Sequence, residues 1–161
     1  MTEPGIKRIL VPVDFSDMTD KVLDYAGFLA RKFDAALTIL YVLHVPHFTE
    51  ASTWLEPVIS PSVEQDVTRQ LESTVEKKIE DLAARCRDKG LEVEAKIKNG
   101  VPFAEILAAA EEEAADMIVM GSQGRTGISH FLVGSVAERV MRRARCSVLV
   151  VKPSPEEKEQ G

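Results

Sequence analysis

Residues 121–135, GSQGRTGISHFLVGS, hold four of the nine glycines in the chain. Glycine lets a backbone approach a ligand closely, and a loop that runs into a helix N-terminus can surround an anion with its amide groups. The apolar run ADMIVM precedes this loop, and the helical pattern SVAERVMRRA follows it. The sequence therefore predicts an anion-binding loop between a strand and a helix, in which Ser135 adds a hydroxyl or caps the helix. A flexible turn without a ligand is the alternative.

Basic side chains gather in the same part of the chain. The whole protein has a net charge of −6, yet residues 121–145 contain five arginines and one acid. Arg142, Arg143 and Arg145 suit a helix C-terminus, whereas Arg125 lies inside the loop and can meet an anion. The acidic balance elsewhere disfavours general binding of nucleic acids or anionic membranes.

Familiar catalytic and phosphate motifs are missing. The loop lacks the GxxxxGK[ST] pattern of P-loop NTPases, and its G-x-x-G-x-x-G spacing differs from the G-x-G-x-x-G of dinucleotide dehydrogenases. His44 and His47 have too few partners for a zinc site. Cys86 falls on an apolar helical stripe and Cys146 begins an apolar run, so both are interpreted as structural. His130 either touches the anion or packs within the loop.

Five short apolar runs alternate with four helical patterns, which predicts βαβ units and a mostly parallel sheet with helices on both faces. The expected strands cover residues 7–13, 36–43, 91–98, 116–120 and 146–152. The expected helices follow Ser16 as an N-cap, run from Val63 towards Gly90, begin at Pro102, and follow the glycine loop.

The chain has 161 residues, the size of one ordinary domain. We interpret residues 1–153 as that domain and 154–161 as a frayed tail. No apolar stretch approaches the roughly 20 residues that cross a bilayer, and two cysteines form no disulfide framework, so we expect a reducing cytoplasm. The irregular stretch 44–62, which contains Trp54, is either mobile or a lid.

Ligands of open parallel sheets bind beyond the carboxyl ends of the strands, where the strand order reverses. Three expected strand tips therefore matter, namely VPVDFS, YVLHV and MGSQG. The glycines of the last tip have a distinctive spacing, because Gly121, Gly124 and Gly134 with Ser135 give G-x2-G-x9-G-[ST].

This spacing resembles that of the universal stress protein family, specifically its ATP-binding branch. The stretch ILVPVDFSD is similar to the opening strand and turn of that family, and VMGSQGRTGISHFLVGSVAERVMRRARCSVLVVK is similar to its closing module. The resemblance covers almost the whole chain and is weakest at 44–62. It implies a Rossmann-like five-stranded sheet of order 3-2-1-4-5, a homodimer, and ATP or a related adenine nucleotide as ligand.

The resemblance also implies the residues of the nucleoside end. Pro12, Val13 and Asp14 match the first-strand tip, which lies against adenine and ribose. Val42 matches an apolar residue that packs on adenine, and Met120 lines the same pocket. Val13 is alternatively an ordinary core residue. Asp14 accepts from the base or ribose, reaches a phosphate-bound Mg²⁺, or caps the following turn.

At the phosphate end, the resemblance implies contacts from the glycine motif and the helix that follows it. The matching residues are Gly121, Gly124, Gly134, Ser135 and Val136. Arg125 occupies a loop position that is often basic, and its contact is our own inference from its charge.

Three functions remain open at this point. The first is a stress-response regulatory protein in which ATP is a ligand more than a fuel, because no clear catalytic base accompanies the loop. The second is a slow ATPase on the same fold, and the third is a dimeric scaffold that binds no nucleotide. We expect the homodimer to form through the edge strand at 146–152, and an unidentified protein partner to sense the nucleotide through the 44–62 segment.

Overall fold

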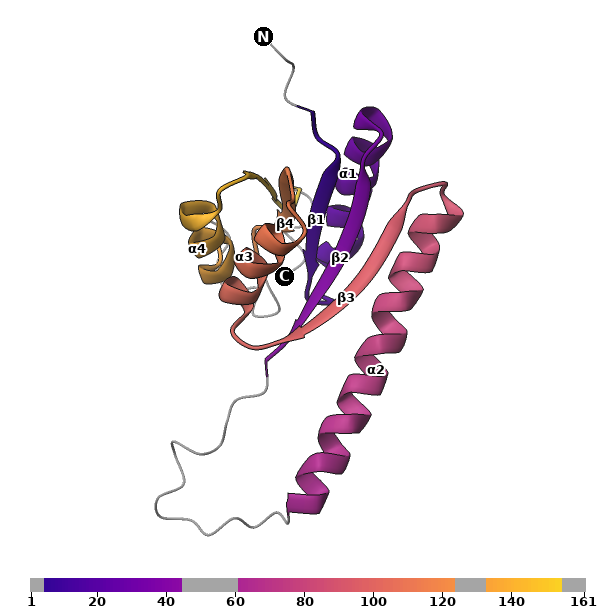
Figure 1. The fold of residues 1–161 in the computed structure, drawn as a ribbon, viewed down its shortest axis with the longest axis vertical. Helices are drawn as coiled ribbons and strands as arrows, with labels where there is room; N and C mark the ends of the chain where they lie inside the picture. Colours follow the sequence, from indigo (N-terminus) through magenta and orange to yellow (C-terminus); the bar gives the residue numbers. More distant parts are fainter. Residues whose placement is uncertain (1–4, 45–60, 124–132, 155–161) are drawn as a thin grey trace.

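The computed structural model describes residues 5–44, 61–123 and 133–154, whose strands and helices alternate along the chain (Figure 1). The strands are β1 (Arg8–Val13), β2 (Ala36–Leu43), β3 (Val93–Asn99), β4 (Met117–Gly121) and β5 (Ser147–Val151). The helices are α1 (Met18–Phe33), α2 (Pro61–Asp88), α3 (Pro102–Glu112) and α4 (Ser135–Arg143). The predicted alternation of strands and helices is confirmed.

The described strands form one parallel sheet in the order β3-β2-β1-β4-β5. The α/β fold class and the strand order implied by the resemblance are therefore confirmed. The order reverses between β1 and β4, which are neighbours in the sheet although two strands separate them in the sequence. α1 and α2 pack on one face of the sheet, and α3 and α4 pack on the other.

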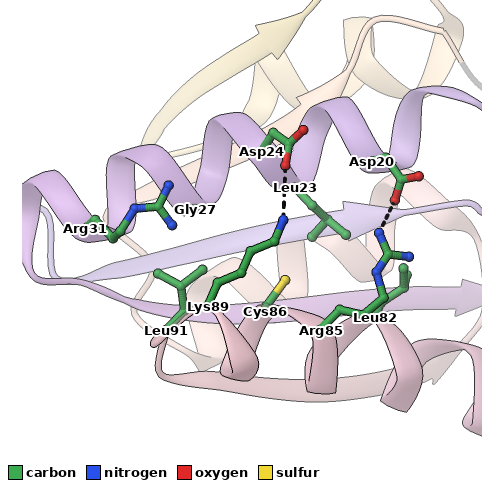
Figure 2. A pocket seen from close by; sticks show the side chains of 10 residues that line it. All are labelled: Asp20, Leu23, Asp24, Gly27, Arg31, Leu82, Arg85, Cys86, Lys89 and Leu91. Atoms are coloured by element: carbon green, nitrogen blue, oxygen red, sulfur yellow. Dashed lines mark hydrogen bonds and ion pairs between the residues drawn. The ribbon is translucent and has the colours of Figure 1, made fainter.

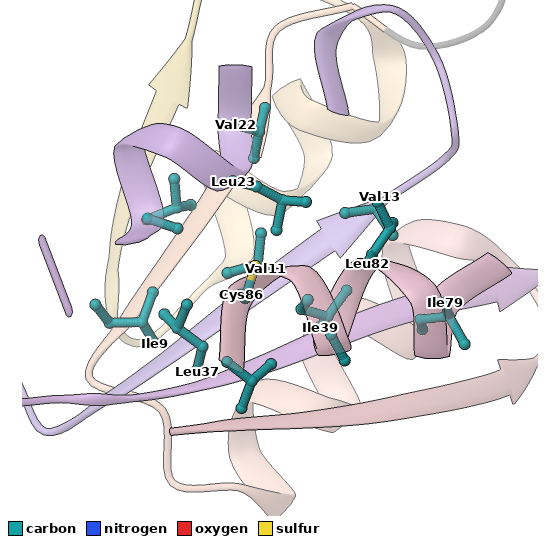
Figure 3. Close-up of a cluster of buried hydrophobic side chains, with 14 of the residues drawn as sticks. Ile9, Val11, Val13, Val22, Leu23, Leu37, Ile39, Ile79, Leu82 and Cys86 are labelled. Atoms are coloured by element: carbon teal, nitrogen blue, oxygen red, sulfur yellow. The ribbon is translucent and has the colours of Figure 1, made fainter. Parts of the chain in front are cut away.

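Alternate residues of each central strand enter two separate hydrophobic cores. In β1, Ile9, Val11 and Val13 pack against α1 and α2 (Figure 3). Leu10 points the other way and packs against α3 and α4. Because both faces are covered, the central strands are mostly apolar instead of alternating between apolar and polar residues.

The longest helix, α2, extends beyond the sheet that it covers (Figure 1). Its C-terminal half buries Ile79 and Cys86 against the sheet, whereas Val67 and Leu71 are about half exposed. The helix begins at Pro61, inside the stretch predicted to be irregular, because proline suits the first turn of a helix. The rest of that stretch, 45–60, lies outside the described residues.

The expectation that Ser16 caps α1 is wrong. The N-cap residue is Asp17, and it makes no side-chain capping hydrogen bond. Ser16 contributes its carbonyl oxygen instead, which accepts a hydrogen bond of 3.0 Å from the Thr19 amide. The chain reaches this turn through Phe15, whose φ of +58° lies in the left-handed region. The N-cap therefore lies one residue beyond the serine, and the helix begins at Met18.

Candidate functional site

The strands β1 and β4 part before they reach their carboxyl ends. Within the described residues, their pairing consists of Ile9 with Met117 and Leu10 with Ile118. Each strand continues to its last residue beside its other neighbour, β2 for β1 and β5 for β4. The two strands therefore part at the point where the strand order reverses, which is where ligands of this class of sheet bind. We call this parting the crevice.

Pro12 lies where the two strands part. The carbonyl of Lys7 accepts a hydrogen bond from Ala36 at the start of β2, and the carbonyl of Arg8 accepts one from Asp116, which precedes β4. Successive residues of a strand turn their main-chain groups to opposite neighbours, so Pro12, like Arg8, turns towards β4. Because proline has no amide hydrogen, β1 cannot donate to β4 at this position.

Val42 and Met120 lie on one side of the sheet, near the crevice. Both pack in the core under α3 and α4, and the alternation along β1 turns Pro12 to the same side. Val13 is only 8% exposed and packs in the opposite core, between the sheet and α1 and α2. The Val13 side chain thus takes the core role that the sequence left open, on the face opposite Val42 and Met120, and a contact of its main chain with a ligand stays a prediction.

Ser122 joins the two ends of the glycine loop. Its amide donates to the carbonyl of Val151 in β5 at 2.9 Å, and its own carbonyl accepts from the amide of Gly134 at 2.6 Å. The side chain is buried, with 4% of its surface exposed. Sequence reasoning missed this role, because nothing in the motif distinguishes a main-chain anchor from any other loop residue. The predicted loop residues Gly124 and Arg125, together with His130, lie outside the described residues.

The first turn of α4 has main-chain amides that are free in one sense, namely that they have no acceptor within the helix. Gly134 is the N-cap residue, and its carbonyl accepts the first helical hydrogen bond from the Glu138 amide at 2.9 Å. The amides of Ser135, Val136 and Ala137 consequently have no acceptor within the helix. Ser135 is exposed and is the first helical residue, so the alternative that it caps the helix is wrong.

Asp14 follows β1 directly and is half-buried. Its Oδ1 accepts a hydrogen bond of 3.0 Å from the Ser16 amide, which is the turn-capping role left open by the sequence. The neighbouring Phe15 ring stacks on Tyr41, with 4.7 Å between ring centroids. The carboxylate is thus held at the mouth of the crevice by a hydrogen bond and a packed turn.

Gly121 ends β4 and does not need to be glycine for folding. Its φ lies outside the left-handed region. A Cβ built on it would lie 3.4 Å from the Gln123 carbonyl oxygen and 3.6 Å from atoms of Met18 and Val22. Because those last two residues belong to α1, the Cβ would point away from the face that holds Val42 and Met120. A side chain at position 121 would therefore not block a ligand on the face that holds Val42 and Met120. Close approach of such a ligand to the backbone does not explain why this residue is glycine.

The described residues contain no metal cluster, since no group of three or more His, Cys, Asp or Glu is arranged to hold an ion. Burial raises the pKa of Cys86 and of Cys146, which keeps both thiols protonated and weakly nucleophilic. Cys86 lies in a narrow cleft between α1 and α2, beside ion pairs that include Arg85 with Asp20 at 2.6 Å (Figure 2). None of the helices in the described ranges has both the length and the apolar character needed to cross a membrane.

The sheet, the crevice and the helix start define a class of α/β proteins with an open parallel sheet and a binding edge at the reversal of strand order. The sequence model of the universal stress protein family matches residues 5–152. The chain belongs to this family.

Several relatives place the chain within the family. Universal stress protein MJ0531 of Methanocaldococcus jannaschii is 36% identical over 154 residues, which cover 94% of this chain and 85% of the relative. The solved structure of MJ0577 from the same organism is 29% identical, with a TM-score of 0.78 over 93% of this chain and 98% of its own.

Two further structures of the fold contain nucleotides. One is a universal stress protein in complex with cAMP, which is 23% identical, with a TM-score of 0.67 over 93% of this chain and 99% of its own. The other is the universal stress protein from Archaeoglobus fulgidus in complex with dAMP, which is 22% identical, with a TM-score of 0.61 over 91% and 98%.

Proposed function

We propose that the protein binds ATP, or a related adenine nucleotide, at the crevice between β1 and β4. The observation that carries the proposal is the start of α4, where three successive amides have no helical acceptor. Free amides and the helix dipole favour a phosphate group at this position. The complexes of two structural relatives with cAMP and dAMP support adenine as the base.

The nucleoside lies at the strand tips in this proposal. Val42 and Met120 form the apolar surface for adenine, because they share the face beside the crevice. Asp14 accepts a hydrogen bond from the base or the ribose while its Oδ1 keeps the Ser16 amide. Pro12 and the main chain of Val13 border the nucleoside.

The phosphates lie along the glycine motif. The residues proposed to contact them are Gly121, Gly124, Arg125, Gly134, Ser135 and Val136. The Ser135 hydroxyl is exposed at the first turn of α4, next to the free amides. Mg²⁺, when present, is carried by the phosphates themselves.

Within this proposal, ATP is a signal more than a fuel, read by a protein partner in a stress response. Phosphoryl transfer needs a positioned base or water-orienting group. Glu138, one turn into α4, pairs with Arg142 at 3.0 Å, and Asp14 holds the Ser16 amide. Neither carboxylate is set up as a base, so binding without rapid turnover is expected. A slow ATPase and a scaffold without nucleotide are the alternatives.

The proposal includes a homodimer that forms through β5. Because the Val151 carbonyl accepts from the Ser122 amide next to β4, the alternation along the strand turns the main-chain groups of Val148 and Val150 to the open edge. The opposite edge strand, β3, carries Lys96 and Lys98 in ion pairs with glutamates, and such charges oppose strand pairing. The apolar β5 edge is therefore the one suited to a second copy.

The test is to purify the protein without added nucleotide and to identify small molecules that stay bound by native mass spectrometry. The proposal expects an adenine nucleotide at one per chain, together with phosphate release far slower than the ~1–10³ s⁻¹ of typical enzymes. Rapid steady-state release of phosphate would make the protein an ATPase. A chain that stays empty after incubation with excess ATP would leave the scaffold alternative.

A further inference from the structure

Two arginines on the outer side of α4 share one aromatic ring. The guanidinium carbon of Arg139 lies 4.8 Å from the centroid of the Phe103 ring in α3, and that of Arg143 lies 5.4 Å from it. A cation held over a ring face is attracted by the ring quadrupole, and the edge of a guanidinium remains able to donate hydrogen bonds. We call Phe103, Arg139 and Arg143 the arginine platform.

The carboxylates around the arginine platform are engaged elsewhere. On α4, Glu138 pairs with Arg142 at 3.0 Å. On α3, Glu111 pairs with Arg145 at 3.5 Å, and the two other glutamates of the helix pair with Lys98 of β3. Glu113, which follows the helix, pairs with Lys96. Within the described parts of the chain, neither Arg139 nor Arg143 has an ion-pair partner. Two fixed positive charges therefore remain available on this face of an acidic protein.

An apolar hollow adjoins the arginine platform. It has a volume of about 190 Å³ and lies between the C-terminal ends of α3 and α4. Leu107, Ala110 and Ala114 supply apolar walls. Arg143 also lines the hollow, as do Glu111 and Arg145, which pair with each other at 3.5 Å. Arg143 thus belongs both to the platform and to the hollow, which places a site for an apolar side chain next to a site for carboxylates.

We propose that this face binds a short acidic peptide segment of another protein, with carboxylates on Arg139 and Arg143 and an aliphatic side chain in the hollow. Guanidinium groups that are already held in place lose little conformational freedom when they meet carboxylates. A nucleic acid fits less well, because strong binding requires many neutralised phosphates and the arginine platform offers two guanidinium groups. The inference does not depend on nucleotide binding.

The probe for this proposal is a fluorescein-labelled peptide, Glu-Glu-Leu-Glu-Glu-Leu-Glu-Glu, whose anisotropy is followed as protein is added. The double variant Arg139→Gln/Arg143→Gln should weaken binding about tenfold. The control variant Arg31→Gln/Lys32→Gln removes the same charge from the end of α1, on the opposite face of the sheet, and should weaken it less than about twofold. Equal losses in the two variants would reduce the effect to overall charge and overturn the proposal.

Three further arms separate the remaining explanations. Replacing both leucines of the peptide by serine should weaken binding severalfold, because no apolar side chain then fills the hollow. Unchanged binding would contradict the assigned role of the hollow.

Phe103→Leu, checked for folding by its melting curve, should weaken binding without changing the charge of the protein. Displacement of the peptide by ATP would overturn the proposal, because it would locate the anion at the glycine loop. Equal binding of an oligothymidylate of the same charge would also overturn it, because the partner would then be a nucleic acid.

Discussion

At the scale of single residues, the crevice owes its shape to groups that carry no charge. Pro12 removes a donor from the ladder between β1 and β4, and Ser122 connects the end of β4 to the start of α4 through two main-chain hydrogen bonds. The effect of Pro12 can be predicted once it is known which neighbouring strand the main-chain groups of Pro12 face. The role of Ser122 cannot be predicted, because a main-chain bond between distant segments leaves no mark on residue type.

Ser135 offers the sharpest test at this scale, because it is exposed and makes no capping bond. Replacing it by alanine should weaken ATP binding by about 1–2 kcal/mol, the contribution of a hydrogen bond from a hydroxyl to a charged oxygen. Calorimetry measures the loss, and Ser135→Thr, which keeps the hydroxyl, should retain most of the affinity. An alanine variant that binds ATP as tightly as the wild type would remove the hydroxyl from the site.

The buried thiol of Cys86 and the partly buried thiol of Cys146 make stability depend on pH. Burial raises the pKa of Cys86 and Cys146 above their ordinary value of 9.0, so the unfolded chain releases these protons first as the pH rises. The thiols therefore contribute their full stabilisation below pH 9.0, the ordinary pKa. This stabilisation is lost as the pH rises through the higher pKa that the thiols have in the folded protein. Urea unfolding near pH 7 and about pH 10 should show a larger loss of unfolding free energy in the wild type than in Cys86→Ala/Cys146→Ala. Equal losses would contradict this assignment.

At the scale of elements, hydrophobic periodicity predicts where the strands and helices lie. It does not predict which face of the sheet each strand side chain points to. β1, β2 and β4 are apolar on both faces, so the sequence does not distinguish the residues of one core from those of the other. Val13 is an example, because the sequence leaves open whether it meets a ligand or packs in the core, and its side chain packs under α1 and α2. The expected start of α1 differs from the observed one because the left-handed turn at Phe15, whose ring stacks on Tyr41, leaves no sign in the hydrophobic periodicity.

Pro12→Ala tests whether the parting of β1 and β4 is needed for binding. The new amide can extend the ladder, which adds about 0.5–1.5 kcal/mol, while the loss of proline rigidity costs about 0.4–1 kcal/mol. We expect the unfolding free energy to change little and ATP affinity to fall severalfold as the crevice narrows. Pro102→Ala, at the first turn of α3, is the matched control and should leave affinity unchanged. Full affinity in Pro12→Ala would show that the crevice is not set by this residue.

At the scale of the whole molecule, the two edges of the sheet differ. β3 carries lysines that pair with α3 glutamates, whereas β5 carries apolar residues and an open row of main-chain groups. The sequence indicates this difference between the edges, because residues 91–98 include charged side chains and the interior of 146–152 includes none. The strand order that places both at edges came from the family resemblance, because periodicity alone does not order parallel strands.

Val150→Pro tests the proposed dimer. It removes a donor that faces the open edge, so it should produce a folded monomer at concentrations where the wild type is dimeric. Leu149→Pro removes a donor that faces β4 and should instead lower the melting temperature. Light scattering and thermal melting measure the two effects. A wild type that stays monomeric at high micromolar concentration would contradict assembly through β5.

The central claim is that the phosphates are held by the free amides at the start of α4, beside the crevice. Calorimetric titration of the wild-type protein with ATP and with adenosine tests it most directly, because the two ligands share the nucleoside and differ in the phosphates. The account predicts that ATP binds at least about tenfold more tightly than adenosine, and that added salt reduces this difference. Adenosine binding as tightly as ATP, or no binding of either, would contradict it.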